Sequence, residues 1–315
     1  MKITPLILLS LILWLPAVAH AASAFKVTEE WKQRVRAAAP GESAVAPAKE
    51  RKVLIFSLTT GFKHWCIPHT AAMVEILGEE SGAYTAVDSM DIEVFLPENL
   101  KQYDAVILNN NCPDRKDRDV FRDVLINQVD QFGQKYADMP EAERVALAEK
   151  LYQSMVDYVS EGGGLVLLHG AIANFSKSDH FSAIAGGSFN FHPKQQDVTL
   201  IPVNPDHSLL KPFEGKPFTH FEEAYFMNRA YEKLDFQPLL EIDVSKLNPD
   251  KRLEKLSNLP RYAAWIKPHG KGRVFFCSPS HNAQSFERPE LLGFILNGIQ
   301  YAIGDLEADD TTPAR

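Results

Sequence analysis

The sequence contains few cysteines, and their arrangement excludes several classes of protein. Its 315 residues include only Cys66, Cys112 and Cys277. No Cys-x-x-Cys pair is present, so the chain carries neither a zinc knuckle nor a thioredoxin-type redox motif. The odd number of cysteines also argues against a disulfide-scaffolded domain. Cys277 lies in an apolar run and is predicted to be buried and unpaired, whereas Cys66 and Cys112 would be the pair if export led to one disulfide.

The chain also lacks an excess of positive charge and any long apolar run beyond its first residues. Its formal net charge is −8 at pH 7. Nucleic acids and anionic membranes are bound through basic faces, so neither is expected as a partner. After the N-terminal segment, no stretch approaches the roughly 20 apolar residues that a transmembrane helix needs. With 45% hydrophobic residues the chain can bury a sizeable core, and its length suits one large domain or two small ones.

The first 21 residues have the layout of a secretory signal peptide. Lys2 provides a positive charge, residues 6–15 form an apolar run, and Ala19-His20-Ala21 places small residues where a signal peptidase cleaves. The alternative, a retained anchor, is disfavoured because the run is short for a membrane span. No cysteine follows that run, which argues against a lipoprotein. We therefore predict a signal peptide at residues 1–21 and an exported protein, periplasmic or secreted, with no stable membrane anchor.

Residues 22–51 are predicted to be a leader or linker, because residues 37–49 are rich in Ala and Pro and show no period. From Lys52 onward, short apolar runs alternate with stretches of helical periodicity. Strands are predicted at 52–58, 84–87, 103–108 and 165–168, and helices at 68–80, 118–132 and 141–160. That order is typical of a doubly wound α/β sheet with parallel strands.

The pattern changes after Gly186-Gly187, where shorter extended runs are separated by Pro-rich turns. The predicted elements are strands at 198–203 and 239–244, a polar surface segment at 243–260, a hairpin of 261–267 with 272–277, and a closing helix at 289–303. Residues 305–315 are predicted to be a polar, frayed tail. The domain itself therefore spans residues 52–304.

Histidine and acidic residues gather at the predicted strand ends, which is where ligands bind in parallel α/β sheets. His64 follows the first strand, His169 ends the fourth, and His281 follows the strand at 272–277. His192 and Glu222-Glu223 lie in loops of the second half. A neutral imidazole is a good acid, base or metal ligand near pH 7. Any one of these histidines alone is more often a structural loop residue, so the prediction depends on their meeting in space.

Six short segments stand along the chain in a recognisable order. They are Gly61-Phe62-Lys63-His64; Gly162-Gly163-Gly164-Leu165 with Leu168-His169; Gly186-Gly187 with His192-Pro193; Glu222-Glu223-Ala224-Tyr225; Ala264-Trp265; and Gly270-Lys271-Gly272-Arg273-Val274-Phe275 with His281. Each segment alone is a weak signal. Together and in this order they resemble the ThuA-like, or trehalose utilisation, family over residues 52–304.

The resemblance implies a flavodoxin-like, doubly wound, mostly parallel sheet with helices on both faces, of the class I glutamine amidotransferase type. It also implies a link to carbohydrate metabolism, with trehalose and its 3-keto derivatives as the associated sugars. In glutamine amidotransferases the fourth strand leads into a Gly-x-Cys-x-Gly elbow, whereas this chain reads Leu168-His169-Gly170-Ala171-Ile172. Because neither Cys nor Ser stands there, the elbow has no attacking atom. We therefore exclude glutamine amidotransfer and cysteine-protease chemistry.

Several glycine, asparagine and aromatic segments have simpler interpretations. Gly162-Gly163-Gly164 precedes a strand and lacks the Gly-Lys-Ser/Thr ending of a phosphate loop, so it is predicted to be a turn. Gly270-Lys271-Gly272 is predicted to be a hairpin turn. Asn109-Asn110-Asn111 could equally bind sugar hydroxyls or turn the chain. Trp265 is predicted to be a core residue rather than a sugar platform.

Two functional hypotheses follow. The first is an exported sugar-processing enzyme, in which a His/Glu site eliminates from or isomerises a 3-keto sugar without a covalent nucleophile. Its predicted residues are His169, His281 and Glu223 for catalysis, His64, Asn110, Glu222 and Tyr225 for substrate binding, and His192 with His64 or Glu223 for a metal. The cofactor considered is a divalent metal such as zinc, although no HExxH spacing is present. The chain has no dinucleotide fingerprint, so an oxidation step would need a separate sugar dehydrogenase as partner.

The second hypothesis is a non-catalytic carbohydrate-binding protein that kept the fold. Its pocket would offer Asn and aromatic side chains without a convergent acid–base pair. The separation of His169, His281 and Glu223 decides between the two. Beyond about 10 Å they could not cooperate directly or through one water, whereas a pair within hydrogen-bond reach favours the enzyme.

Overall fold

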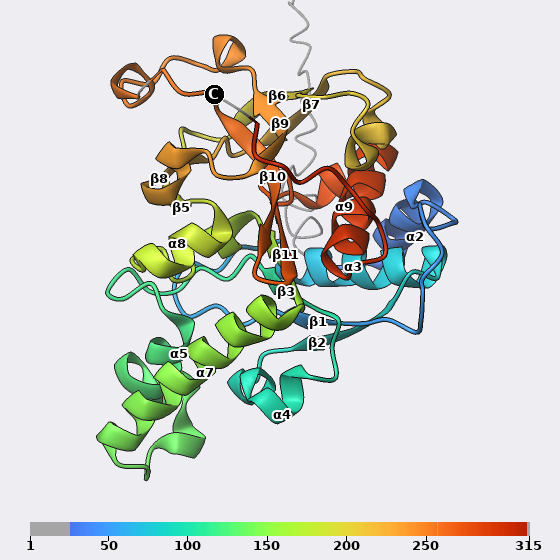
Figure 1. Ribbon diagram of the computed structural model, residues 1–315. Coiled ribbons are helices and arrows are strands. Elements are labelled where there is room, and N and C mark those ends of the chain that lie inside the picture. The colour runs from blue at the N-terminus through green and yellow to red at the C-terminus, as the bar shows by residue number, and fades with distance from the viewer. Residues whose placement is uncertain (1–25, 257, 314–315) are drawn as a thin grey trace, which may run out of the picture.

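The computed structural model describes residues 26–256 and 258–313 (Figure 1). The predicted signal peptide, residues 1–21, lies outside this range. In the part of the chain that is described, no helix has the length and apolar character to cross a membrane.

A central sheet of nine strands runs through the described residues in the order β2-β1-β3-β4-β11-β10-β9-β6-β7. The first five in that order are parallel to one another, and the last four continue the sheet in antiparallel fashion. The parallel strands are β1 (Lys52–Phe56), β2 (Thr85–Ser89), β3 (Ala105–Asn109), β4 (Gly164–Leu168) and β11 (Gly272–Cys277). The others are β10 (Tyr262–His269), β9 (Gln237–Ile242), β6 (Gln196–Pro202) and β7 (Phe218–Glu222), while β5 (Ser188–Phe191) and β8 (Phe226–Asn228) form a small second sheet.

Helices cover both faces of the parallel part. The longer ones are α2 (Glu29–Ala38), α3 (Ile67–Ser81), α7 (Glu141–Glu161), α8 (Asp179–Ala185) and α9 (Pro289–Ala302), and the shorter ones are α4 (Pro97–Leu100), α5 (Val120–Arg122) and α6 (Val129–Phe132). The 3₁₀ segments are η1 (Ile92–Phe95), η3 (Gln134–Tyr136), η4 (His169–Ala173), η5 (Ser208–Phe213), η6 (Arg229–Lys233), η7 (Val244–Lys246), η8 (Leu253–Lys255) and η9 (Ala283–Glu287).

Alternate residues of each parallel strand pack into two separate hydrophobic clusters. In β1, Val53 and Ile55 belong to the cluster under α2, α3 and α9, while Leu54 and Phe56 belong to the cluster under α5, α7 and α8. Figure 1 shows these two groups of helices on opposite sides of the sheet. A strand covered on both faces needs apolar side chains at every position, which explains the continuous apolar runs. The predicted flavodoxin-like, doubly wound sheet with helices on both faces is confirmed.

The prediction of one continuous helix over residues 118–132 is wrong. The segment consists of α5, a π-helical turn η2 (Asp123–Asn127) and α6. The interruption begins at Asp123, whose buried carboxylate accepts hydrogen bonds from the Thr60 hydroxyl at 2.6 Å and the Asp114 amide at 2.8 Å. This carboxylate ties the loop after β1 to the loop after β3, a long-range demand that periodicity does not reveal.

The predicted leader at residues 22–51 is corrected from residue 26 onward. Part of it forms α2, whose Trp31 and Val35 are buried in the core. The Trp31 indole donates a hydrogen bond to the Ala283 carbonyl at 3.1 Å. Residue 52 is therefore a strand start and not a domain boundary.

The C-terminal segment is anchored rather than frayed. Arg51 forms an ion pair with Asp305, Arg273 with Glu307, and the Tyr301 hydroxyl donates to Asp310 at 2.8 Å. Arg51 and Asp305 lie 254 residues apart and Arg273 and Glu307 lie 34 apart, so the polar composition of the tail did not reveal these contacts. The prediction of a frayed tail is wrong as far as Asp310.

All three cysteines of the chain lie in the described part, and all are free and buried. The disulfide considered between Cys66 and Cys112 is therefore not formed, and Cys277 is the buried residue predicted. The hairpin turn is also confirmed, with β10 and β11 antiparallel and Gly270 at φ 59°. Trp265 is fully buried and its indole donates to the Ala185 carbonyl, as expected for a core residue.

Candidate functional site

Four side chains from separate loops meet beyond the carboxyl ends of the parallel strands. His64 follows β1, His169 ends β4, His281 follows β11, and Glu223 follows β7. One nitrogen or oxygen from each lies within 4.8 Å of the corresponding atoms of the others. The distance test set by the sequence analysis therefore favours the enzyme hypothesis, since His169 Nε2 lies 3.3 Å from Glu223 Oε2.

The His169 ring is held in one tautomer by the backbone. Its Nδ1 lies 2.8 Å from the Ser278 carbonyl oxygen. A carbonyl only accepts, so Nδ1 carries the proton and Nε2 keeps its lone pair, the tautomer being assigned from this contact. Nε2 then points at the Glu223 carboxylate, which is also an acceptor. The residue adopts a positive φ of 42°, a strained conformation of the kind that gathers at functional sites.

The contact between His169 and Glu223 is not an ion pair at neutral pH. His169 is fully buried, and this burial, together with the charge of His281, lowers the pKa of His169 to about 3. The imidazole is therefore neutral, and two lone pairs face each other across 3.3 Å. Either a proton or a metal ion between the two atoms would satisfy both acceptors.

His64 presents a second unmet nitrogen. Its side chain is buried, and its Nδ1 has no hydrogen-bond partner among the residues that the structure describes. Burial, and then the charges of His169 and His281, lower the pKa of His64 to about 2. Gly170 permits this packing, because a Cβ there would lie 2.5 Å from His64 Cε1. The elbow position thus holds a glycine so that a histidine can approach.

Glu222 orients His281 from behind. The Glu222 carboxylate lies 3.2 Å from His281 Nδ1 and accepts from the His281 backbone amide at 3.2 Å. Burial lowers the pKa of His281, but the hydrogen bond and charge of Glu222 outweigh it and raise the pKa overall. For Glu222 the two effects have the opposite signs: burial raises its pKa, but the hydrogen bond from His281 lowers the pKa overall. This is the carboxylate–histidine arrangement that supports metal-binding imidazoles. Glu222 therefore positions His281. It does not line the carboxyl-end pocket, so the predicted substrate-binding role does not fit it.

The donor set fits a divalent metal. It offers three imidazole nitrogens and one carboxylate oxygen, of which two imidazoles are held neutral by burial. Nitrogen donors with one carboxylate suit zinc or a similar transition metal. The unpaired nitrogen of His64 and the opposed lone pairs of His169 and Glu223 are what such an ion would satisfy.

His192 stands beside this cluster rather than in it. Its Nε2 lies 3.7 Å from Glu223 Oε2, and its side chain is 36% exposed. The Pro193 carbonyl lies 2.8 Å from His192 Nδ1, so Nδ1 carries the proton and Nε2 keeps its lone pair. The predicted metal role of His192 is therefore less fitting than a role on the pocket wall.

A pocket of about 820 Å³, here called the carboxyl-end pocket, lies over the cluster. Predicted site residues that line it are His64, His192, Glu223 and Tyr225. The remaining lining residues are Thr60, Gly61, Phe62, Cys112, Pro113, Asp114, Arg115, Arg118, Gln128, Gln131, Ala173 and Phe189. His169 and His281 lie beneath this surface, which suits metal ligands better than groups that exchange protons with a substrate.

Two further predicted binding residues support the site from within. Tyr225 is buried, with its ring centroid 4.0 Å from that of His169, and burial raises the pKa of its hydroxyl. Asn110 is fully buried and approaches the Gly170 amide and the Ser280 carbonyl, both at 3.4 Å. Asn109 and Asn111 donate to backbone carbonyls. The asparagine run therefore holds the loops, and a direct contact with a ligand is not expected from Asn110.

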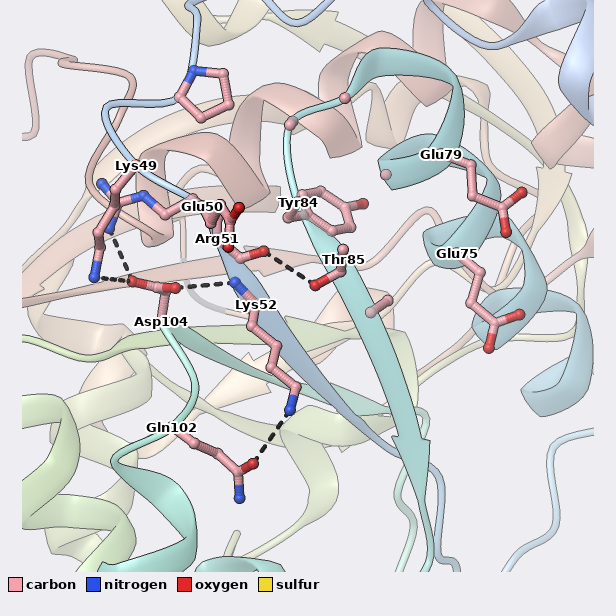
Figure 2. A pocket seen from close by; sticks show the side chains of 15 residues that line it. Lys49, Glu50, Arg51, Lys52, Glu75, Glu79, Tyr84, Thr85, Gln102 and Asp104 are labelled. Atoms are coloured by element: carbon pink, nitrogen blue, oxygen red, sulfur yellow. Dashed lines mark hydrogen bonds and ion pairs between the residues drawn. The ribbon is translucent and has the colours of Figure 1, made fainter.

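A larger pocket of about 1000 Å³ lies at the opposite, amino ends of β1 and β2, and is here called the amino-end pocket. Figure 2 shows Lys49 and Arg51 pointing toward Asp104, and Lys52 toward Gln102. Its basic groups thus already have partners on its own walls. We assign the functional site to the smaller pocket, because the buried His64 Nδ1 on its wall lacks a hydrogen-bond partner, whereas no described residue lining the amino-end pocket has such an atom.

Sequence reasoning missed several contributors. The Ser278 carbonyl, Gln195 at 3.2 Å from His281 Nδ1, and Arg115 and Arg118 on the pocket wall were not singled out. The charged run Asp114–Asp119 after the third strand was the one available signal, since it follows a carboxyl strand end.

Comparisons with known proteins agree with this architecture. A family model described as ThuA, trehalose utilisation, matches residues 139–302. A solved ThuA-like protein from Bacteroides uniformis is similar in fold, with a TM-score of 0.56 and 17% identity over 82% of this chain and 92% of that one. Another from Parabacteroides merdae has a TM-score of 0.53 and 16% identity over 85% and 93%. No curated protein matches the chain.

Proposed function

The chain belongs to the ThuA family, described as trehalose utilisation, and on that premise we propose that it is a carbohydrate-processing enzyme that uses a divalent metal and moves a proton on its sugar. The observation that supports this most is the convergence of four ligand atoms within 4.8 Å under a pocket. A protein that only binds a sugar does not need four converging metal-ligand atoms beneath its pocket.

The metal would be held by His64, His169, His281 and Glu223, with Glu222 and the Ser278 carbonyl orienting the imidazoles. When bound, it would polarise a carbonyl or hydroxyl oxygen of the sugar as a Lewis acid. This assignment exchanges the predicted roles of His192 and the two deeper histidines, because His169 and His281 are buried whereas His192 faces the pocket.

His192 is the proposed acid–base group. It lines the carboxyl-end pocket, and the Pro193 carbonyl fixes the proton on Nδ1, which leaves Nε2 with a lone pair. A keto group on a sugar acidifies the neighbouring C–H, so Nε2 would take that proton. In an isomerisation it would return the proton to the former carbonyl carbon, while the hydroxyl proton of the neighbouring carbon moves to the former carbonyl oxygen. In an elimination it would give the proton to the leaving oxygen. Neither route needs a covalent nucleophile.

The pocket lacks an activated nucleophile among its described lining residues. Cys112 lines it, but burial raises the pKa of its thiol despite the nearby Arg118. A neutral thiol is a poor nucleophile. This supports the exclusion of amidotransferase chemistry made from the elbow sequence.

Two earlier expectations remain proposals. We propose export to the periplasm or medium from the signal-peptide features of residues 1–21. We also propose that a separate sugar dehydrogenase supplies the keto sugar, because the chain has no dinucleotide motif.

Proton NMR on residues 22–315 tests the proposal, using trehalose and 3-ketotrehalose with and without a chelator. Turnover of the keto sugar alone, lost with the chelator and in His192→Ala, is the expected result. The matched control is His180→Ala, an exposed histidine outside the pocket. Broadened sugar signals without turnover by the metal-loaded protein would instead support the carbohydrate-binding protein.

A further inference from the structure

Two arginines without acidic partners stand on the wall of the carboxyl-end pocket. Arg115 and Arg118 both line this pocket and an adjoining one of about 400 Å³. Phe189 and His192 also line both, so the two spaces adjoin along one wall. This positive pair stands out in a chain with a net charge of −8.

Arg118 is held in place but keeps most of its donors free. Its Nη1 donates to the Pro113 carbonyl at 3.0 Å and approaches Cys112 Sγ at 3.3 Å. Within the described residues, no carboxylate lies within ion-pair distance, and Nε and Nη2 have no hydrogen-bond partner. The residue has a φ of 56°, in the left-handed region that non-glycine residues rarely adopt. Its backbone is held there by Asp114 and Phe175.

Arg115 is exposed at the pocket rim and forms no ion pair or hydrogen bond within the described residues. Arg252, a third arginine beside these pockets, has an acidic partner. Arg252 lines the adjoining pocket but binds Asp250 through Nε and Nη2, at 3.0 and 2.6 Å. Two of the three guanidinium groups around the adjoining pocket thus have no acidic partner in the described part of the chain.

The acidic groups of the pocket do not neutralise this pair. Glu223 faces His169 and His192 at the floor. Asp114 is exposed, and its Oδ1 accepts a hydrogen bond from the Lys116 amide at 2.8 Å. Neither carboxylate lies within 4.0 Å of Arg115 or Arg118. Guanidinium groups recognise carboxylates and phosphates through paired hydrogen bonds.

We infer that the site acts on an anionic carbohydrate, a sugar bearing a carboxylate or phosphate, whose charged group binds Arg115 and Arg118 while the reacting carbon faces His192 and Glu223. This rests on the proposed function, since it names the substrate class of that same site. Phe62, which is 64% exposed, and Phe189 provide apolar surface along the pocket for the sugar ring. The anion would thus be held away from the metal ligands.

Calorimetric binding of glucose, glucuronate and glucose 6-phosphate to the zinc-loaded protein tests the inference. We expect at least one charged sugar to bind about tenfold or more tightly than glucose, as charge-assisted hydrogen bonds would give. The Arg115→Ala/Arg118→Ala variant should lose that preference and keep its glucose affinity. Any contact between the anion and zinc is common to all variants, so the difference isolates the two arginines. The glucuronate and phosphate arms identify which anion is preferred.

Arg122→Ala is the matched control, because Arg122 carries the same charge nearby, pairs with Asp117 at 3.7 Å and does not line either pocket. It should keep the preference. Single Arg115→Ala removes an exposed side chain and serves if the double variant folds poorly.

Equal affinity for glucose and both charged sugars would overturn the inference and leave the proposed function standing. A preference for charged sugars that survives in the double variant would overturn it as well. Failure of every sugar to bind or react would overturn the proposed function and the inference together.

Discussion

The two pockets at opposite ends of the parallel strands differ in whether their polar groups have hydrogen-bond or ion-pair partners. In the amino-end pocket, Lys49 and Arg51 pair with Asp104, and Lys52 donates to Gln102 (Figure 2). In the carboxyl-end pocket, a buried nitrogen of His64 is unpaired and His169 faces Glu223 with two lone pairs opposed. The amino-end pocket is the larger of the two.

Between these two pockets, unmet bonding capacity rather than volume distinguishes the assigned site. Charges that already have partners leave little bonding capacity to offer a ligand. Buried polar atoms without partners are costly, and they persist where a ligand or ion completes them. The comparison can be tested by variants that remove a group from one pocket and leave the other intact.

The largest expected effect is on metal binding. His169→Ala removes a ligand from a cluster of four, and zinc affinity should fall by about 100-fold or more. Metal content after dialysis, measured by mass spectrometry, checks this. Lys52→Ala in the amino-end pocket should keep its zinc. Retention of stoichiometric zinc by His169→Ala would remove the basis for contrasting the pockets.

A large effect on stability is expected at the amino end. Arg51→Ala leaves Asp104 and the buried side chain of Asp305 without their shared cation. Breaking a buried ion pair from one side should lower the free energy of unfolding by about 3 kcal/mol. Urea denaturation measures this, and zinc affinity should not change. A loss of zinc in Arg51→Ala would show that the two ends are coupled.

Glu222→Gln should weaken zinc binding by about 10- to 100-fold, the usual result of removing a group that orients a metal-bound imidazole. The amide keeps the shape but loses the charge that holds His281. Competition with a chromogenic chelator gives the affinity. Glu79→Gln, on the wall of the amino-end pocket, is the control and should leave zinc affinity unchanged.

The loss of folding stability at low pH should depend on Asp104. Burial raises the pKa of Asp104, but Lys49, the Lys52 amide and Arg51 lower it overall. A carboxyl with a lower pKa in the folded state stabilises the fold above its unfolded pKa of about 3.9, and this is lost as pH falls through the folded value. Asp104→Asn should therefore lose less stability than the wild type on acidification, as measured by thermal melts. Parallel pH curves for both would contradict the assignment.

The smallest effect is expected for Lys49→Ala. Its ammonium pairs with Asp104 at 2.8 Å, but its side chain is 64% exposed. An exposed ion pair contributes about 0 to 1 kcal/mol, so urea denaturation should detect little change. A loss of unfolding free energy comparable to that of Arg51→Ala would mean that the exposed Lys49 contributes as much stability as Arg51.

The periodicity of the chain was sufficient to predict the parallel half of the fold. The apolar runs of β1, β3 and β4 and the helical spacing in α3, α7 and α9 are local properties, and the structure has these elements close to the predicted positions. The prediction was wrong where the structure of a segment depends on a contact with a residue that is distant in sequence. Trp31 docks α2 on a residue 252 positions away, and a helix is interrupted at Asp123, whose carboxylate binds Thr60.

The residues at the carboxyl ends of the strands could be identified from sequence, because strand positions follow from local patterns and parallel strands end at one edge. Their roles depend on contacts that form only in the folded protein. The tautomer of His169 depends on a carbonyl 109 residues away, and the burial that holds His64 and His169 neutral comes from loops of both halves. Burial and hydrogen bonding are properties of the assembled site, so His169 and His192 could be placed at the site from sequence but not told apart.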